Sequence, residues 1–198
     1  LAVRAGGIWA AHSHDSEAGK DHQEEGVLAY DPHVWLDPEN AKAMARAMAS
    51  HLARLDATNA ATYIANSDRF AASIDSLSAE IVRTLAPLRD KRFVVFHDAF
   101  QYFEKRFDLA GGGSIADVSA APPSARRLND IKRMIAEDHV VCVFREPQYD
   151  DRFVRAAIED SGARPGVLDP IGAELEPGAG AYGLLLTGLA HDFAACMR

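Results

Sequence analysis

Arg92-Phe93-Val94-Val95-Phe96 opens the part of the chain in which short apolar runs alternate with helical patterns. This run predicts a short buried strand, and a helix should follow it from about Ala99 to Phe107. Further apolar runs predict strands at Gly111–Ile115, where the glycines also make a turn, at Val140–Phe144 and at Pro165–Leu168.

Helical patterns separate these strands. Ser124 should cap a helix that runs to Glu137, a shorter helix should cover about Asp150–Asp160, and the last should run from Tyr182 to Cys196. Strands of about four to six residues separated by helices of about 10–14 residues predict an α/β fold. We expect a small, mostly parallel sheet flanked by helices on both faces.

The first half of the chain should be helical. Asp37 can cap a helix whose first residue is Pro38, and an apolar stripe follows at helical spacing: Met44, Met48, Leu52 and Leu55. A longer helix should start at Asn59 and end before Pro87, with a length of about 40 Å. That length exceeds what a small domain needs and predicts a strut that runs along or between lobes.

The composition limits the partners of the chain. Its 198 residues fit one or two domains, and its hydrophobic content of 48% is enough for a core. The net charge of −8 argues against nucleic acid and anionic membranes and is compatible with cations. The sequence has no apolar run long enough to span a membrane. It starts at Leu1 without Met, and we therefore expect a processed or trimmed piece.

Residues before position 30 contain a histidine-rich segment. Leu1–Arg4 could form a strand that the glycines after it would end, and residues 11–26 lack apolar periodicity, which predicts a mobile loop. The loop combines acids with three histidines that could capture a divalent metal loosely, or be a solvated loop or tag remnant: His12, His14 and His22.

One turn and three strand ends carry candidate metal ligands. His33 lies in Asp31-Pro32-His33-Val34-Trp35-Leu36-Asp37-Pro38, between two Asp-Pro pairs. His97, Glu146 and Asp169 each follow a predicted strand closely, and parallel strands bring such ends to one edge of the sheet. Two imidazoles and a carboxylate would suit zinc.

Each of these residues has a plainer explanation. His33 could be a packing or surface residue, and His97 could cap the helix after it. Glu146 could pair with a neighbouring arginine, and Asp169 could be a turn residue. A zinc hydrolase with His33, His97 and Asp169 as ligands and Glu146 as base is also compatible with the residue types.

The two cysteines leave two possibilities open. Cys142 and Cys196 are either unrelated thiols or a bridge between a central strand and the final helix. Such a bridge would close a loop of about 55 residues and contribute at most about 4 kcal/mol.

Four segments together resemble the metal-binding lipoprotein and periplasmic solute-binding family of ABC importers, in particular its zinc-specific ZnuA type. They are Asp31–Pro38, then Phe96-His97-Asp98-Ala99-Phe100-Gln101-Tyr102-Phe103, then Phe144-Arg145-Glu146-Pro147-Gln148-Tyr149, then Leu168-Asp169-Pro170-Ile171-Gly172. They occur in the order of the family, and the histidine-bearing loop before them is similar as well.

The resemblance implies a ligand set and a disulfide. His33 and His97 would be metal ligands, Asp169 a further ligand or a neighbour of the metal, and Glu146 a residue behind the ligands. A histidine at position 97, where manganese binders of the family usually carry Glu, favours zinc over manganese. Cys142 and Cys196 occupy the positions of the family's disulfide.

The resemblance also implies a division of the chain and a biological role. Residues 1–30 would be the tail of a missing N-terminal lobe and the mobile loop, 31–90 the ligand loop with the linking helices, and 91–198 the C-terminal α/β lobe. We expect a periplasmic, monomeric zinc-capture protein, not an enzyme, that delivers to the permease of an ABC importer with only part of the site in this chain. A manganese-binding relative, a zinc hydrolase and a structural or adhesive role are the alternatives.

Overall fold

The computed structural model describes residues 1–4 and 30–198 of the chain. Its centre is a sheet of four strands: β1 (Phe93–His97), β2 (Gly111–Ala116), β3 (Cys142–Arg145) and β4 (Arg164–Val167). The strands lie in the order β2-β1-β3-β4, and every pair is parallel. The expected mostly parallel sheet is therefore confirmed and is parallel throughout.

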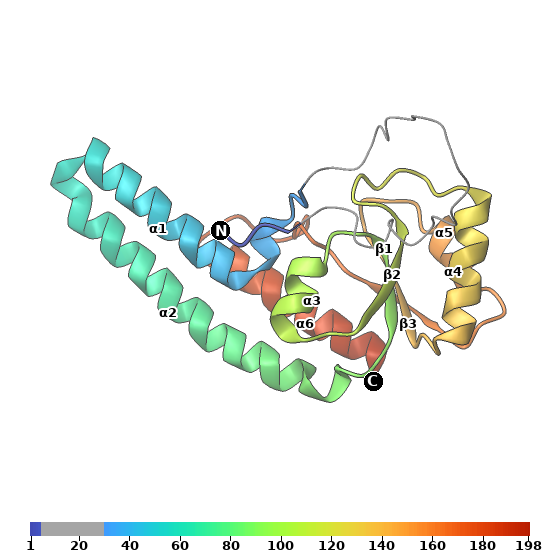
Figure 1. The fold of residues 1–198 in the computed structure, drawn as a ribbon. Coiled ribbons are helices and arrows are strands. Elements are labelled where there is room, and N and C mark those ends of the chain that lie inside the picture. Colours follow the sequence, from blue (N-terminus) through green and yellow to red (C-terminus); the bar gives the residue numbers. More distant parts are fainter. Residues whose placement is uncertain (5–29) are drawn as a thin grey trace.

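Helices cover both faces of the sheet (Figure 1). One face carries α3 (Gln101–Phe107) and α6 (Ala181–Met197), and the other carries α4 (Ala125–Glu137) and α5 (Arg152–Ile158). Successive residues of β1 point to opposite faces, so that Phe93 and Val95 join one core while Val94 and Phe96 join the other. This strand is buried on both sides, which explains its unbroken apolar run.

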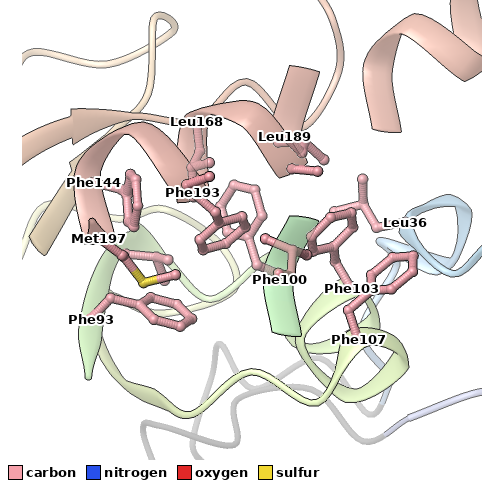
Figure 2. Packing of buried hydrophobic residues seen from close by; sticks show 14 of the residues in the cluster. Leu36, Phe93, Phe100, Phe103, Phe107, Phe144, Leu168, Leu189, Phe193 and Met197 are labelled. Carbon is pink, nitrogen blue, oxygen red and sulfur yellow. The ribbon is translucent and has the colours of Figure 1, made fainter. Parts of the chain in front are cut away.

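Phe193 of α6 is the centre of the larger core. Its ring lies 5.0 Å from the ring centroids of both Phe93 and Phe144, and it stacks on Phe103 at 5.6 Å (Figure 2). The contacts join β1, β3, α3 and α6. Aromatic pairs of this kind contribute beyond the area that they bury.

Two antiparallel helices extend away from the sheet (Figure 1). They are α1 (Pro38–Leu55) and α2 (Ala60–Leu85), joined by the 3-10 turn η3 (Ala57–Asn59). Asp37 caps α1 through the Glu39 N–H at 2.9 Å, as predicted. With 26 residues, α2 is about 39 Å long. A further turn, η4 (Ala86–Leu88), leads from α2 toward β1.

The apolar stripe of α1 differs from a buried face. Met48, Leu52 and Leu55 are 59%, 43% and 72% exposed, whereas the small residues Ala41 and Ala49 are buried. Alanines allow α1 and α2 to approach closely, so the longer side chains stand at the edge of the contact.

Several predicted boundaries shift. α3 begins two residues after the expected Ala99, and β3 begins at Cys142 because Val140 and Val141 belong to the loop that precedes it. Ser124 caps α4 as predicted, with its Oγ accepting the Arg127 N–H at 3.1 Å. The suggested strand at Leu1–Arg4 is wrong, because this segment pairs with no strand of the described chain and instead exchanges two hydrogen bonds with the Asn40 side chain through Ala2.

A disulfide joins Cys142 to Cys196, as the family resemblance implied. It connects the first residue of β3 to the last turn of α6, across a sequence separation of 54. Among the described residues, no helix combines the length and the apolar content that crossing a bilayer requires.

We predict that the Cys142→Ala/Cys196→Ala double variant is less stable than the oxidised chain by up to about 4 kcal/mol, because the unfolded state regains the freedom of the closed loop. Urea unfolding of both forms measures the difference. Reduction of the unmodified chain should give a similar loss. Equal unfolding midpoints for all three samples would contradict the prediction.

Glu104 of α3 is a buried carboxyl near Gly111 on β2. A Cβ atom at Gly111 would lie 2.5 Å from Glu104 Oε2, so a larger residue there would require the carboxyl to shift. The pKa of Glu104 is raised to about 8, mainly by burial, with a smaller rise from the charges of Asp98 and Asp31 that Lys105 opposes.

This raised pKa predicts a pH dependence of stability. Between about pH 4.5 and pH 8 the folded state holds a proton that the unfolded state releases, so the free energy of unfolding falls as pH rises through that window. Glu104→Gln should remove up to about 1.4 kcal/mol of this slope per pH unit. Urea unfolding of both proteins across the window measures it, and parallel profiles would show that Glu104 ionises normally.

Candidate metal centre

His33 is held by the carboxylate two residues before it. Asp31 Oδ1 accepts both the His33 backbone N–H, at 2.8 Å, and the ring nitrogen Nδ1, at 2.7 Å. Both side chains are buried. The 3-10 turn η2 (Val34–Leu36) follows, and its fully buried Leu36 anchors the turn in the core. The imidazole therefore has a fixed orientation, with Nε2 directed away from Asp31.

His97 has the same arrangement with a partner from another strand. It is the last residue of β1, and Glu146 directly follows β3, which pairs with β1 in parallel. Glu146 Oε1 accepts the His97 backbone N–H at 3.2 Å and lies 2.6 Å from Nδ1. In the strand order, the chain runs from β1 to its neighbour β2 on one side and from β3 to its neighbour β4 on the other side. The ends of β1 and β3 therefore lie at the point where open α/β sheets bind ligands.

The free nitrogens of the two histidines face each other. His33 Nε2 lies 3.3 Å from His97 Nε2, and the ring centroids are 5.1 Å apart. In the neutral tautomer in which Nδ1–H donates to the carboxylate, Nε2 has a lone pair for a metal. Two nitrogen ligands of one tetrahedral zinc ion, at about 2.05 Å from it, would be about 3.3 Å apart.

The charge around the pair also suits a cation. Asp31 Oδ2 and Glu146 Oε2 are buried and have no hydrogen-bond partner among the described residues. The two acidic side chains beside the imidazoles thus lie in a region of low dielectric. A divalent cation between the imidazoles would offset the negative charge that these side chains carry when ionised.

Aromatic rings shield the imidazoles from solvent. Trp35 lies 5.3 Å from the His33 ring, and Tyr149 lies 5.6 Å from the His97 ring, with Phe100 at 6.5 Å. Burial and the charge of Glu146 raise the pKa of Tyr149, so its hydroxyl stays neutral at physiological pH.

Tyr102 connects the two histidine-bearing elements. It is fully buried on α3, the helix that follows His97, and its hydroxyl donates to the Asp31 carbonyl at 3.0 Å. The same hydroxyl accepts the Arg4 N–H at 2.9 Å. Near it, Arg106 of α3 makes a bidentate ion pair with Asp37, at 2.7 and 2.9 Å. These contacts fix the His33 turn against α3.

Asp169 is engaged by its own loop after β4. Its carboxylate accepts the backbone N–H groups of Ile171, Gly172 and Ala173 and the Gln148 side-chain amide at 2.7 Å. The structure brings His33 and His97 together. It does not add Asp169 to them, since the described residues contain no group of three or more His, Cys, Asp or Glu side chains that could hold a metal. A ligand role for Asp169 stays a prediction.

The loop histidines, Asp31 and Glu146 remain to be compared with the sequence predictions. The histidines of the N-terminal loop, His12, His14 and His22, lie outside the described residues. Asp31 received no role from the sequence, although its position two residues before His33 was the available signal. The pairing of Glu146 with His97, and not with Arg145 or Arg152, fits the supporting position that the family resemblance implied for it.

The chain matches the family described as "Zinc-uptake complex component A periplasmic" over residues 2–196. It belongs to this ZnuA family. It is 40% identical over 168 residues to the high-affinity zinc uptake system protein ZnuA of Brucella abortus (strain 2308), an alignment that covers 85% of the chain and 50% of that relative. The chain therefore spans about half the length of the curated ZnuA relatives that it matches.

Solved structures of similar proteins share the fold. A crystal structure of ZnuA superposes with a TM-score of 0.76 at 29% identity, covering 89% of this chain and 64% of that one. A mutant of the laminin-binding adhesin Lmb from Streptococcus agalactiae also gives 0.76, at 27% identity, with coverage of 90% and 67%. Both likenesses show the same fold, and the family match over residues 2–196 confirms the membership that the four sequence segments indicated.

We predict that Glu146→Gln weakens zinc binding about 10–100-fold, because the neutral amide holds the His97 ring less firmly and leaves Nε2 less basic. Isothermal titration with zinc measures the change. Glu104→Gln is the control, since it replaces another buried glutamate that does not contact either imidazole. Equal affinities for both variants would argue against support of His97 by Glu146.

Proposed function

We propose that this chain captures Zn²⁺ between His33 and His97 and is part of a periplasmic solute-binding protein that delivers zinc to the permease of an ABC importer. The observation that carries the proposal is the 3.3 Å separation of the two Nε2 atoms, each backed by a buried carboxylate on Nδ1. Zinc-uptake function in the named relatives supports it.

The pair supplies half of a tetrahedral site. Zinc takes four ligands in such a site. We propose Asp169 as the third after its carboxylate leaves the loop amides, and a donor outside the described residues as the fourth. Two imidazoles favour zinc over manganese, which prefers oxygen ligands. The monomeric state and the division into a ligand segment and an α/β lobe belong to the same proposal.

Capture without catalysis fits the site better than hydrolysis. Asp31 and Glu146 each bond the Nδ1 atom of an imidazole, on the side of the ring away from the Nε2 atom that would bind zinc, so neither is placed as a general base for a metal-bound water. We expect no turnover of ester or phosphoester probes by the zinc-loaded chain.

Metal content tests the proposal. The untagged chain should carry about one zinc ion, and the His33→Ala/His97→Ala double variant should carry none at this site, because both Nε2 ligands are gone. Elemental analysis after gel filtration measures the ratio. His191→Ala is the matched control, since His191 is exposed on α6, and it should keep its zinc. Stoichiometric zinc in the double variant would refute the ligand assignment.

A further inference from the structure

Trp35 connects the loop of His33 to the loop of Asp169. Its indole Nε1–H donates to the Pro170 carbonyl at 2.9 Å, across 135 positions of sequence. Trp35 lies two residues after His33, and Pro170 directly follows Asp169. One hydrogen bond thus joins the segment that carries His33 to the segment that carries Asp169. The Asp169 carboxylate itself is not grouped with the imidazole pair.

Both ends of this bond are fixed by other contacts. The Trp35 carbonyl accepts the Tyr182 hydroxyl of α6 at 2.7 Å, and the indole ring lies 5.3 Å from the His33 ring. Three backbone N–H groups converge on the Asp169 carboxylate and fold residues 169–173 into a compact turn. A shift at Pro170 would therefore move the whole turn relative to the imidazoles.

We propose that Trp35 is a positioning residue that holds the Asp169 turn beside the imidazole pair and so determines whether a bound cation can recruit the carboxylate. This inference rests on the proposed zinc capture and adds the residue that controls the third ligand. Trp35 contributes no ligand atom itself. Because carboxylate oxygen suits manganese better than imidazole does, Trp35 would also influence the choice between the two metals.

A double-mutant cycle tests the role. Trp35→Phe keeps an aromatic ring against His33 and the carbonyl that Tyr182 bonds, but removes the N–H. We expect it to weaken zinc binding about fivefold, the effect of one hydrogen bond, and to weaken manganese binding more. In an Asp169→Ala background the same change should cause no further loss, because the turn then carries no ligand.

Tyr182→Phe is the control for a loosened His33 turn. It releases the Trp35 carbonyl and leaves the indole bond to Pro170 in place, so its effect should be the same in both backgrounds. Replacement of the Trp35 indole by benzothiophene, which keeps the ring shape and lacks the N–H, gives a second variant. Urea midpoints close to the unmodified chain confirm that each variant folds.

An equal loss from Trp35→Phe with and without Asp169, or no loss from the benzothiophene replacement, would overturn the positioning role. Either result would leave zinc binding by the unmodified chain intact. Failure of the proposed function looks different, since the unmodified chain would then bind no zinc or the double histidine variant would keep it.

Discussion

Parallel pairing of β1 with β3 is the constraint on which the site depends. The pairing aligns Phe93 with Cys142, so both strands end at the same edge, and Glu146 arrives beside His97. Burial of β1 on both faces, with Phe193 packed against one of them, leaves the strand no freedom to slip. A slip of one residue would turn His97 to the opposite face and separate it from both Glu146 and His33.

The helical segment places the second imidazole without help from the sheet. The His33 turn is fixed to α3 and the core by Leu36, by Tyr102 and by the Asp37–Arg106 ion pair. Trp35 connects the same turn to the Pro170 carbonyl in the loop after β4. Each imidazole has its own carboxylate, one local in sequence and one distant. The two histidines thus have the same kind of hydrogen-bond partner on Nδ1, although Asp31 and Glu146 come from unrelated elements of the fold.

Sequence patterns predicted the fold closely because its strands are continuous apolar runs and its helices carry clear caps at Asp37 and Ser124. They could not predict that β3 starts at Cys142, since Val140 and Val141 are as apolar as the strand itself. They singled out His33 and His97 as candidate ligands through their positions, and the structure brings the two side chains together. The role of Asp31 and the orientation of Asp169 depend on backbone amides and on turn geometry, and residue types alone do not encode these.

The two imidazoles come from positions 64 residues apart in the chain. An unfolded chain cannot hold such a pair at 3.3 Å, so a cation that prefers two imidazoles discriminates strongly between the folded and unfolded states. By mass action, the concentration of free metal then becomes a variable of conformational stability, and the apparent free energy of unfolding rises with the logarithm of that concentration above the dissociation constant. A chain without bound metal would then unfold more easily than the metal-loaded chain.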